Sequence, residues 1–126
     1  MACTTPYPLP SVRPRWRTPD AAIREAVMHS PLRGRGIDYA RIPGTGDERA
    51  AAIDAHSRVW AVLAQLDRRE RAVIIGRALM LSYEEIAAFA EEQGVRGLSR
   101  SSAHRLAREV WPRVRDRLVE LGLVDA

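Results

Sequence analysis

The chain has 126 residues, of which 46% are hydrophobic, so it is long enough for one domain with a tail or arm and too apolar for wholesale disorder. It carries a formal net charge of +4, and its single cysteine, Cys3, excludes a disulfide framework and a cysteine-based metal site. No apolar run approaches the length of a membrane span, and the proline-broken N-terminus lacks the apolar centre of a secretory signal, so we expect a cytoplasmic protein.

Charge is distributed unevenly. Residues 1–46 hold seven arginines and three acidic residues, and residues 96–126 hold seven arginines and four acidic residues. Between them, residues 47–95 hold six arginines and nine acidic residues, so two basic ends flank an acidic middle. We expect a negatively charged partner to meet the two basic ends. All 20 basic residues are arginine, whose forked guanidinium suits phosphates and base edges, although a GC-rich genome also explains this bias.

Residues 1–19 contain five of the eight prolines and are predicted to form a disordered or extended basic arm. Core packing does not readily explain Trp16 in such an arm, so we treat it as a candidate contact with nucleic acid or polymerase. Residues 20–47 are predicted to hold a short helix, with Asp20 as its N-cap, and an irregular linker.

From residue 48 the pattern becomes helical, and a first helix is expected over 48–66. Its buried stripe consists of Ile53, His56, Trp60, Leu63 and Leu66. His56 is interpreted as a packed histidine rather than a ligand, and His29 as isolated from it. Trp60 and Trp111 are expected in the core.

Two later positions have the spacing of a capping box: Asp67 before Glu70, and Ser82 before Glu85. Leu81 and Ile86 add a hydrophobic staple to the second box, and Gly94 is a suitable end for that helix. Ser99 can cap the next helix. Pro112 should kink that helix or end it and start another, because proline lacks an amide donor and its ring clashes with the preceding turn.

The segment 81–111 therefore reads as helix, short turn, helix, with a further helix upstream, which is the layout of a helix-turn-helix. We predict an all-α bundle of four to five helices, with the helix-turn-helix domain over 48–126. The second helix would enter the major groove through the short or forked polar residues of its N-terminal turns: Arg100, Ser101, Ser102, His104 and Arg105. The positive N-terminal end of the helix adds attraction for phosphate.

Residues 66–120 resemble a known family in three pieces: LD and RER at 66–67 and 69–71, LSYEEIA at 81–87, and LSRSS with RL at 98–102 and 105–106. They are similar to the promoter-reading helix-turn-helix of bacterial sigma factors and of small phage transcription regulators, including late-gene activators and antiterminators. The connection EEQGVRG is longer than the turn typical of that family. The chain has no room for the large polymerase-binding domain of a sigma factor, which favours a small regulator.

The resemblance implies that Arg100, Ser101, His104 and Arg105 face base edges. It also implies contact with RNA polymerase and phosphate contacts from five residues: Ser82, Tyr83, Arg96, Ser99 and Arg108. The sequence shows no catalytic residue set, and we expect no enzyme activity, metal or cofactor. A monomer or homodimer is expected.

Two alternatives stay open. A small terminase-type DNA-packaging subunit would use a similar motif within a ring, and the stripe Val114, Leu118 and Leu121 could then serve assembly. A protein-only adaptor would bind polymerase or a sigma factor through the acidic middle and leave DNA alone. A ring in sedimentation favours the first, and polymerase retention without a duplex shift favours the second.

Overall fold

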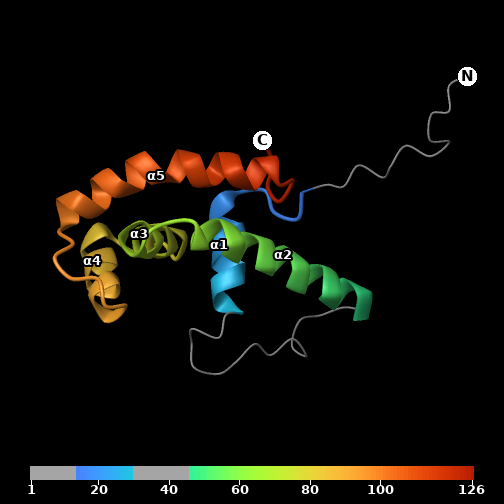
Figure 1. The fold of residues 1–126 in the computed structure, drawn as a ribbon, viewed down its shortest axis with the longest axis horizontal. Coiled ribbons are helices and arrows are strands. Elements are labelled where there is room, and N and C mark those ends of the chain that lie inside the picture. Colours follow the sequence, from blue (N-terminus) through green and yellow to red (C-terminus); the bar gives the residue numbers. More distant parts are fainter. Residues whose placement is uncertain (1–13, 30–45) are drawn as a thin grey trace, which may run out of the picture.

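The protein is described by a computed structural model that covers residues 14–29 and 46–126. Within these ranges it forms five packed helices and no strand: α1 (Pro19–Met28), α2 (Gly46–Ala64), α3 (Arg68–Ala78), α4 (Tyr83–Glu92) and α5 (Arg100–Glu120) (Figure 1). The predicted all-α bundle is confirmed. None of the described helices combines the length and apolar character needed to span a bilayer. The rest of the predicted arm and the linker over 30–45 lie outside the described residues.

Both predicted capping boxes are present. The Asp67 carboxylate accepts the Glu70 amide at 2.8 Å, and the Glu70 carboxylate accepts the Asp67 amide at 3.1 Å. Ser82 and Glu85 make the same reciprocal pair at 3.1 and 3.0 Å. Each box satisfies two amide donors that a helix start leaves unpaired, so α3 and α4 begin where the sequence predicts.

The start of α1 differs from the prediction. Its N-cap is Thr18, whose hydroxyl accepts the Ala21 amide at 3.2 Å, and Pro19 is the first helical residue. The assignment of Asp20 as N-cap is therefore wrong. Proline fits the first helical position because its φ is already helical and no intrahelical donor is lost there. Asp20 lies in the first turn instead, where its charge complements the helix dipole.

Three helices end in the same way. The residue after each C-cap has a positive φ, at Met80 (63°), Gly94 (84°) and Gly122 (72°). The following amide then donates back into the last turn, from Leu81 to Gly76, from Val95 to Ala90 and from Leu123 to Leu118. This is the Schellman motif, for which glycine is the usual residue. Gly94 confirms the predicted end of α4, Gly122 ends α5 in the same way, and Met80 is a left-handed residue that the sequence did not indicate.

Helix α5 runs through Pro112 without stopping. Of the two outcomes predicted there, a kink or a stop and restart, the restart is therefore wrong. Pro112 is exposed, whereas Val110, Trp111, Val114 and Leu118 on the inner side are buried. The missing hydrogen bond and the ring clash, together about 3 kcal/mol, fall on the solvent side, and burial of the inner side chains offsets them. Figure 1 shows α5 arching over α3.

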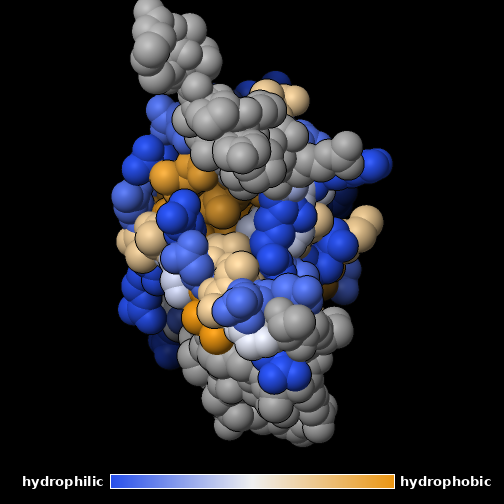
Figure 2. All heavy atoms as spheres, turned by 90° about the vertical axis from the view of Figure 1, so that its right-hand side faces the viewer, coloured by the Kyte–Doolittle hydropathy of each residue, from blue (hydrophilic) through white to orange (hydrophobic). Residues whose placement is uncertain are grey.

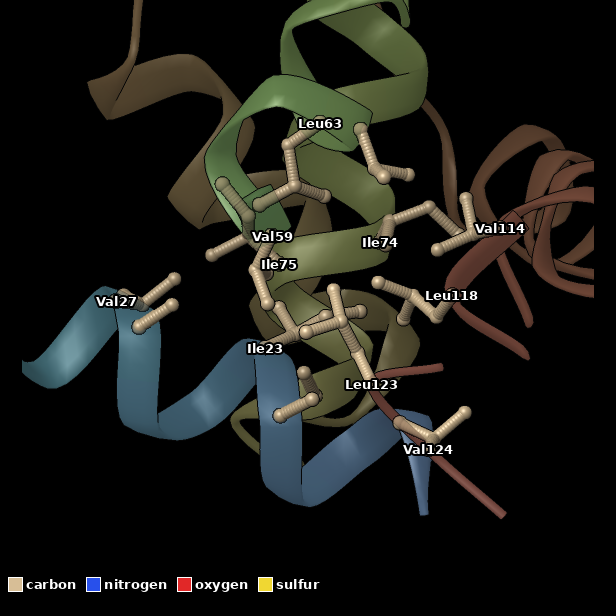
Figure 3. Packing of buried hydrophobic residues seen from close by; sticks show 14 of the residues in the cluster. Ile23, Val27, Val59, Leu63, Ile74, Ile75, Val114, Leu118, Leu123 and Val124 are labelled. Atoms are coloured by element: carbon tan, nitrogen blue, oxygen red, sulfur yellow. The ribbon is translucent and has the colours of Figure 1, made fainter. Parts of the chain in front are cut away.

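The larger core gathers α1, α2, α3 and the C-terminal half of α5. Ile23 from α1, Leu63 from α2, Ile74 from α3 and Leu118 from α5 are fully buried, and Figure 3 shows them converging on one interior. Helix α1 lies on the side of this core where the chain also ends. The predicted burial of Trp111 is confirmed, and Trp60 packs half-buried against the core edge.

Trp16 belongs to this core, so its interpretation as a surface contact is wrong. It is only 8% exposed and forms a parallel bridge with Val124. Its amide donates to the Leu123 carbonyl at 3.2 Å, and its carbonyl accepts the Asp125 amide at 3.3 Å. The chain segment before α1 is thus fastened to the segment after α5.

Hydrophilic residues surround a band of hydrophobic ones at the end of the molecule where α2 begins and α5 finishes (Figure 2). Val119 and Leu121 are half-buried at that end of α5 and pack against the larger core. The core therefore reaches the surface at the opposite end of α5 from its polar N-terminal turns.

Candidate nucleic-acid interface

A second, smaller core joins α3, α4 and the N-terminal half of α5 into a three-helix unit. Its buried members are mostly small or β-branched: Ala72, Val73, Ile86, Ala90, Val95, Leu98, Ala103 and Ala107. Small residues allow close approach of the helices, and Gly76 of α3 is the extreme case, because a Cβ there would lie 2.8 Å from Ile86 Cγ1. This packing fixes the angle at which α5 leaves α4.

The connection between α4 and α5 is long but anchored. Gly94 takes a left-handed φ, and Gly97 takes a second one of 78°. Val95 lies between the two glycines and Leu98 follows the second one. Each is 7% exposed and belongs to the smaller core. Two buried side chains therefore hold the turn in place, and Ser99 is delivered as the N-cap of α5.

Ser99 and Ser102 are occupied by the cap itself. The Ser99 hydroxyl accepts the Ser102 amide at 3.1 Å and donates to the Ser102 hydroxyl at 2.9 Å. Ser102 is also half-buried, unlike its neighbour Ser101. Of the five predicted base-contacting residues, Ser102 is thus placed to shape the helix end.

The other four predicted base-contacting residues are exposed on the outer side of α5: Arg100, Ser101, His104 and Arg105. The inner side of the same turns carries Ala103 and Ala107, which are completely buried. No described residue forms an ion pair or hydrogen bond with the side chain of Ser101, His104 or Arg105. These polar groups are therefore available to an external partner.

Two contacts connect the outer side of α5 with the start of α4. His104 and Tyr83 meet edge to face, with ring centroids 4.9 Å apart. The guanidinium of Arg100 lies 3.7 Å from the Glu84 carboxylate, with both side chains more than 70% exposed. The first contact orders the His104 ring, whereas the second is a solvated pair worth at most about 1 kcal/mol.

The five predicted phosphate-contacting residues are spread over three segments. Ser82 and Tyr83 lie at the start of α4, Arg96 and Ser99 in the connection, and Arg108 two turns into α5. Ser82 and Ser99 serve as N-caps. The helix N-terminus at Ser99 favours anions, whereas at Ser82 the Glu85 carboxylate already accepts the Ser82 amide. Arg96 and Arg108 are exposed, and no described residue forms an ion pair with either.

Part of the acidic middle of the sequence lies next to this surface. The exposed side of α4 carries only acidic charge, from Glu84, Glu85, Glu91 and Glu92. A hydrogen bond from the Ser82 amide, with a second from its hydroxyl, lowers the pKa of Glu85 below its usual value, so this carboxylate is ionised at neutral pH. A polyanion would approach α5 and the turn rather than this side of α4.

A second feature lies in the larger core. One Glu25 oxygen accepts from Trp16 Nε1 and contacts His56 Nε2, both at 3.0 Å. His56 is 4% exposed. Its ring stacks with the Trp16 ring at a centroid distance of 6.0 Å and with the His29 ring at 5.3 Å. The packed role predicted for His56 is confirmed, but the isolation of His29 from it is wrong. No sequence signal links Glu25 to a residue 31 positions away.

The described residues contain no group of three or more potential metal ligands. Comparison with known proteins found no family model, no curated protein and no solved structure that matches this chain. The geometry of α3, α4 and α5 is therefore the basis for inferring a function.

Proposed function

We propose that the chain is a sequence-specific, DNA-binding transcription regulator of the kind found in phages, acting with RNA polymerase. The N-terminal turns of α5 would enter the major groove, and α4 would fix their angle. The observation that carries the proposal is the division of α5 between a fully buried alanine side and an exposed side of Arg100, Ser101, His104 and Arg105. A helix of this kind fits the roughly 12 Å width of the groove.

The test is selection of bound sequences from a random duplex pool at two salt concentrations. Two salts are needed because phosphate contacts release counterions and weaken as salt rises. Enrichment of one sequence at both concentrations supports base readout. Failure of the protein to retain any duplex in dilute buffer would overturn the proposal.

Substitution of Arg105 sharpens this test. Arg105→Ala should weaken binding to the selected sequence by about 1–3 kcal/mol and relax the preference at one base position. Arg117→Ala is the matched control, because Arg117 lies on another side of the same helix and pairs with Glu120 at 3.0 Å. An equal loss of affinity for the selected and the random duplex would mean that Arg105 contacts only phosphate.

The two rival functions are affected differently by the structure. Val114 and Leu118 are 2% and 0% exposed within the chain's own core, so the stripe suggested for ring assembly is not available for it. The acidic side of α4 gives the adaptor some support, because it suits a basic protein surface. Retention of RNA polymerase without any duplex shift, and loss of that retention on Glu91→Gln with Glu92→Gln, would favour the adaptor.

A further inference from the structure

The continuity of α5 through Pro112 aligns residues that a broken helix would separate. Ser101, Arg108 and Arg115 recur at intervals of seven residues, and such residues drift by only about 20° per step around a straight helix. All three are exposed. We call these three residues the outer track of α5.

The length of the outer track exceeds the width of the groove. At 1.5 Å per residue, Arg108 lies about 10 Å along the axis from Ser101, and Arg115 lies about 21 Å from it. The major groove is about 12 Å wide. When the N-terminal turns of α5 reach base edges across the groove, Arg108 lies near the edge of the groove. Arg115 lies outside the groove, and its long side chain has to reach back to the phosphates that flank it.

The charge of Arg115 is weakly engaged within the chain. Its described ion pair is with the adjacent residue, Asp116, at 3.1 Å, and the two side chains are 52% and 69% exposed. Pairs of this kind contribute little, so a phosphate can replace the carboxylate. Arg113, two residues earlier, instead pairs with Glu70 of α3 at 3.3 Å and faces the body of the protein.

We propose that Arg115 binds a DNA phosphate and extends the interface two turns beyond Arg108. The inference depends on the proposed function, because α5 must first enter the groove. Arg115 would set the tilt of α5 and add affinity without adding sequence preference.

The experiment compares Arg115→Gln with Arg117→Gln in the full chain. Both substitutions remove one positive charge and break one exposed ion pair, and the two side chains leave the helix about 200° apart. Binding to the selected duplex and to a random duplex is measured by fluorescence anisotropy between 50 and 200 mM salt, with circular dichroism confirming equal helix content.

Arg115→Gln should make the negative slope of log affinity against log salt shallower by about 0.9. Between 50 and 200 mM salt, the variant should therefore lose about threefold less affinity than the wild type. It should weaken binding to both duplexes by the same factor, while Arg117→Gln leaves the slope unchanged. Equal effects of the two substitutions would mean that only net charge matters and would overturn the inference.

The two proposals fail in different ways. If the wild-type protein binds no duplex, the proposed function fails and the inference fails with it. If Arg105→Ala relaxes base preference as expected but Arg115→Gln leaves the salt slope unchanged, the function stands and the inference is refuted.

Discussion

At Gly76, the addition of a single methyl group by Gly76→Ala should destabilise the three-helix unit of α3, α4 and α5. A Cβ at this position would meet Ile86 Cγ1 at 2.8 Å, with Cβ and Cγ2 of the same side chain at 3.4 Å. Ile86 is 1% exposed, and a β-branched side chain in a helix has one strongly preferred χ1, so Ile86 cannot relieve the clash by changing its rotamer. The cost must therefore be met by moving α3 away from α4.

The magnitude follows from two opposing effects. Overpacking of this kind costs about 1–3 kcal/mol, whereas alanine is favoured over glycine inside a helix by about 1 kcal/mol. Gly76→Ala should thus lower the free energy of unfolding by about 1 kcal/mol. In a background that already carries Ile86→Ala, the contact is gone, and the same substitution should raise the free energy of unfolding by about 0.5–1 kcal/mol.

Urea unfolding of the four proteins in this cycle measures both values, and the expected coupling between the two positions is about 2 kcal/mol. The change of sign is the critical observation. If Gly76→Ala is as stable as the wild type, or if the two substitutions are additive, the close approach of α3 and α4 is not rigid. The angle of α5 would then be less firmly fixed than the smaller core implies.

Two further predictions concern stability. Met80→Gly should raise the free energy of unfolding by about 1 kcal/mol, because Met80 holds a φ of 63° with its side chain 79% exposed; a loss of stability in thermal melts would refute this. Partial burial raises the pKa of Glu25, but the hydrogen bond and charge of His56, with smaller help from Arg15 and Trp16, outweigh it and leave that pKa below its usual value. Because its pKa is lowered in the folded state, Glu25 stabilises the fold at pH values above its unfolded-state pKa of about 4.3, and this stabilisation is lost as the pH falls through the folded-state pKa. Glu25→Gln should therefore lower the free energy of unfolding by about 1 kcal/mol at pH 7 and by almost nothing near pH 3. Urea titrations at the two pH values measure this difference.

Local signals in the sequence predicted most of the helix boundaries. The capping boxes of Asp67 and Ser82, and the glycines at 94 and 122, act within four residues of the positions they determine. Such interactions depend on neighbours in the chain, so a single sequence contains everything needed to recognise them. The exposed side of α5 was predictable for the same reason, because buried and exposed residues alternate at helical spacing.

Non-local contacts account for the errors at Trp16 and His29. Trp16 lies among prolines and arginines that indicate an arm, yet it pairs with Val124 at the far end of the chain. The stacking of His29 with His56 similarly joins residues on two helices separated by a linker. Both errors concern a contact whose partner lies outside any local window. The wrong N-cap of α1 is different, because it was a choice between two nearby residues, Thr18 and Asp20.

The two cores together explain how so small a protein can present α5 rigidly. Ala103 and Ala107 near the start of α5 belong to the smaller core, whereas Val114 and Leu118 nearer its end belong to the larger one. A recognition helix held only at its start could tilt about the three-helix unit, and its far arginines would have no fixed position. Because α1, α2 and the pairing of Trp16 with the C-terminal segment secure the second half of α5, the tilt is set by the whole fold. This is why Arg115, at the far end of the outer track, has a defined position relative to the residues that we propose enter the groove.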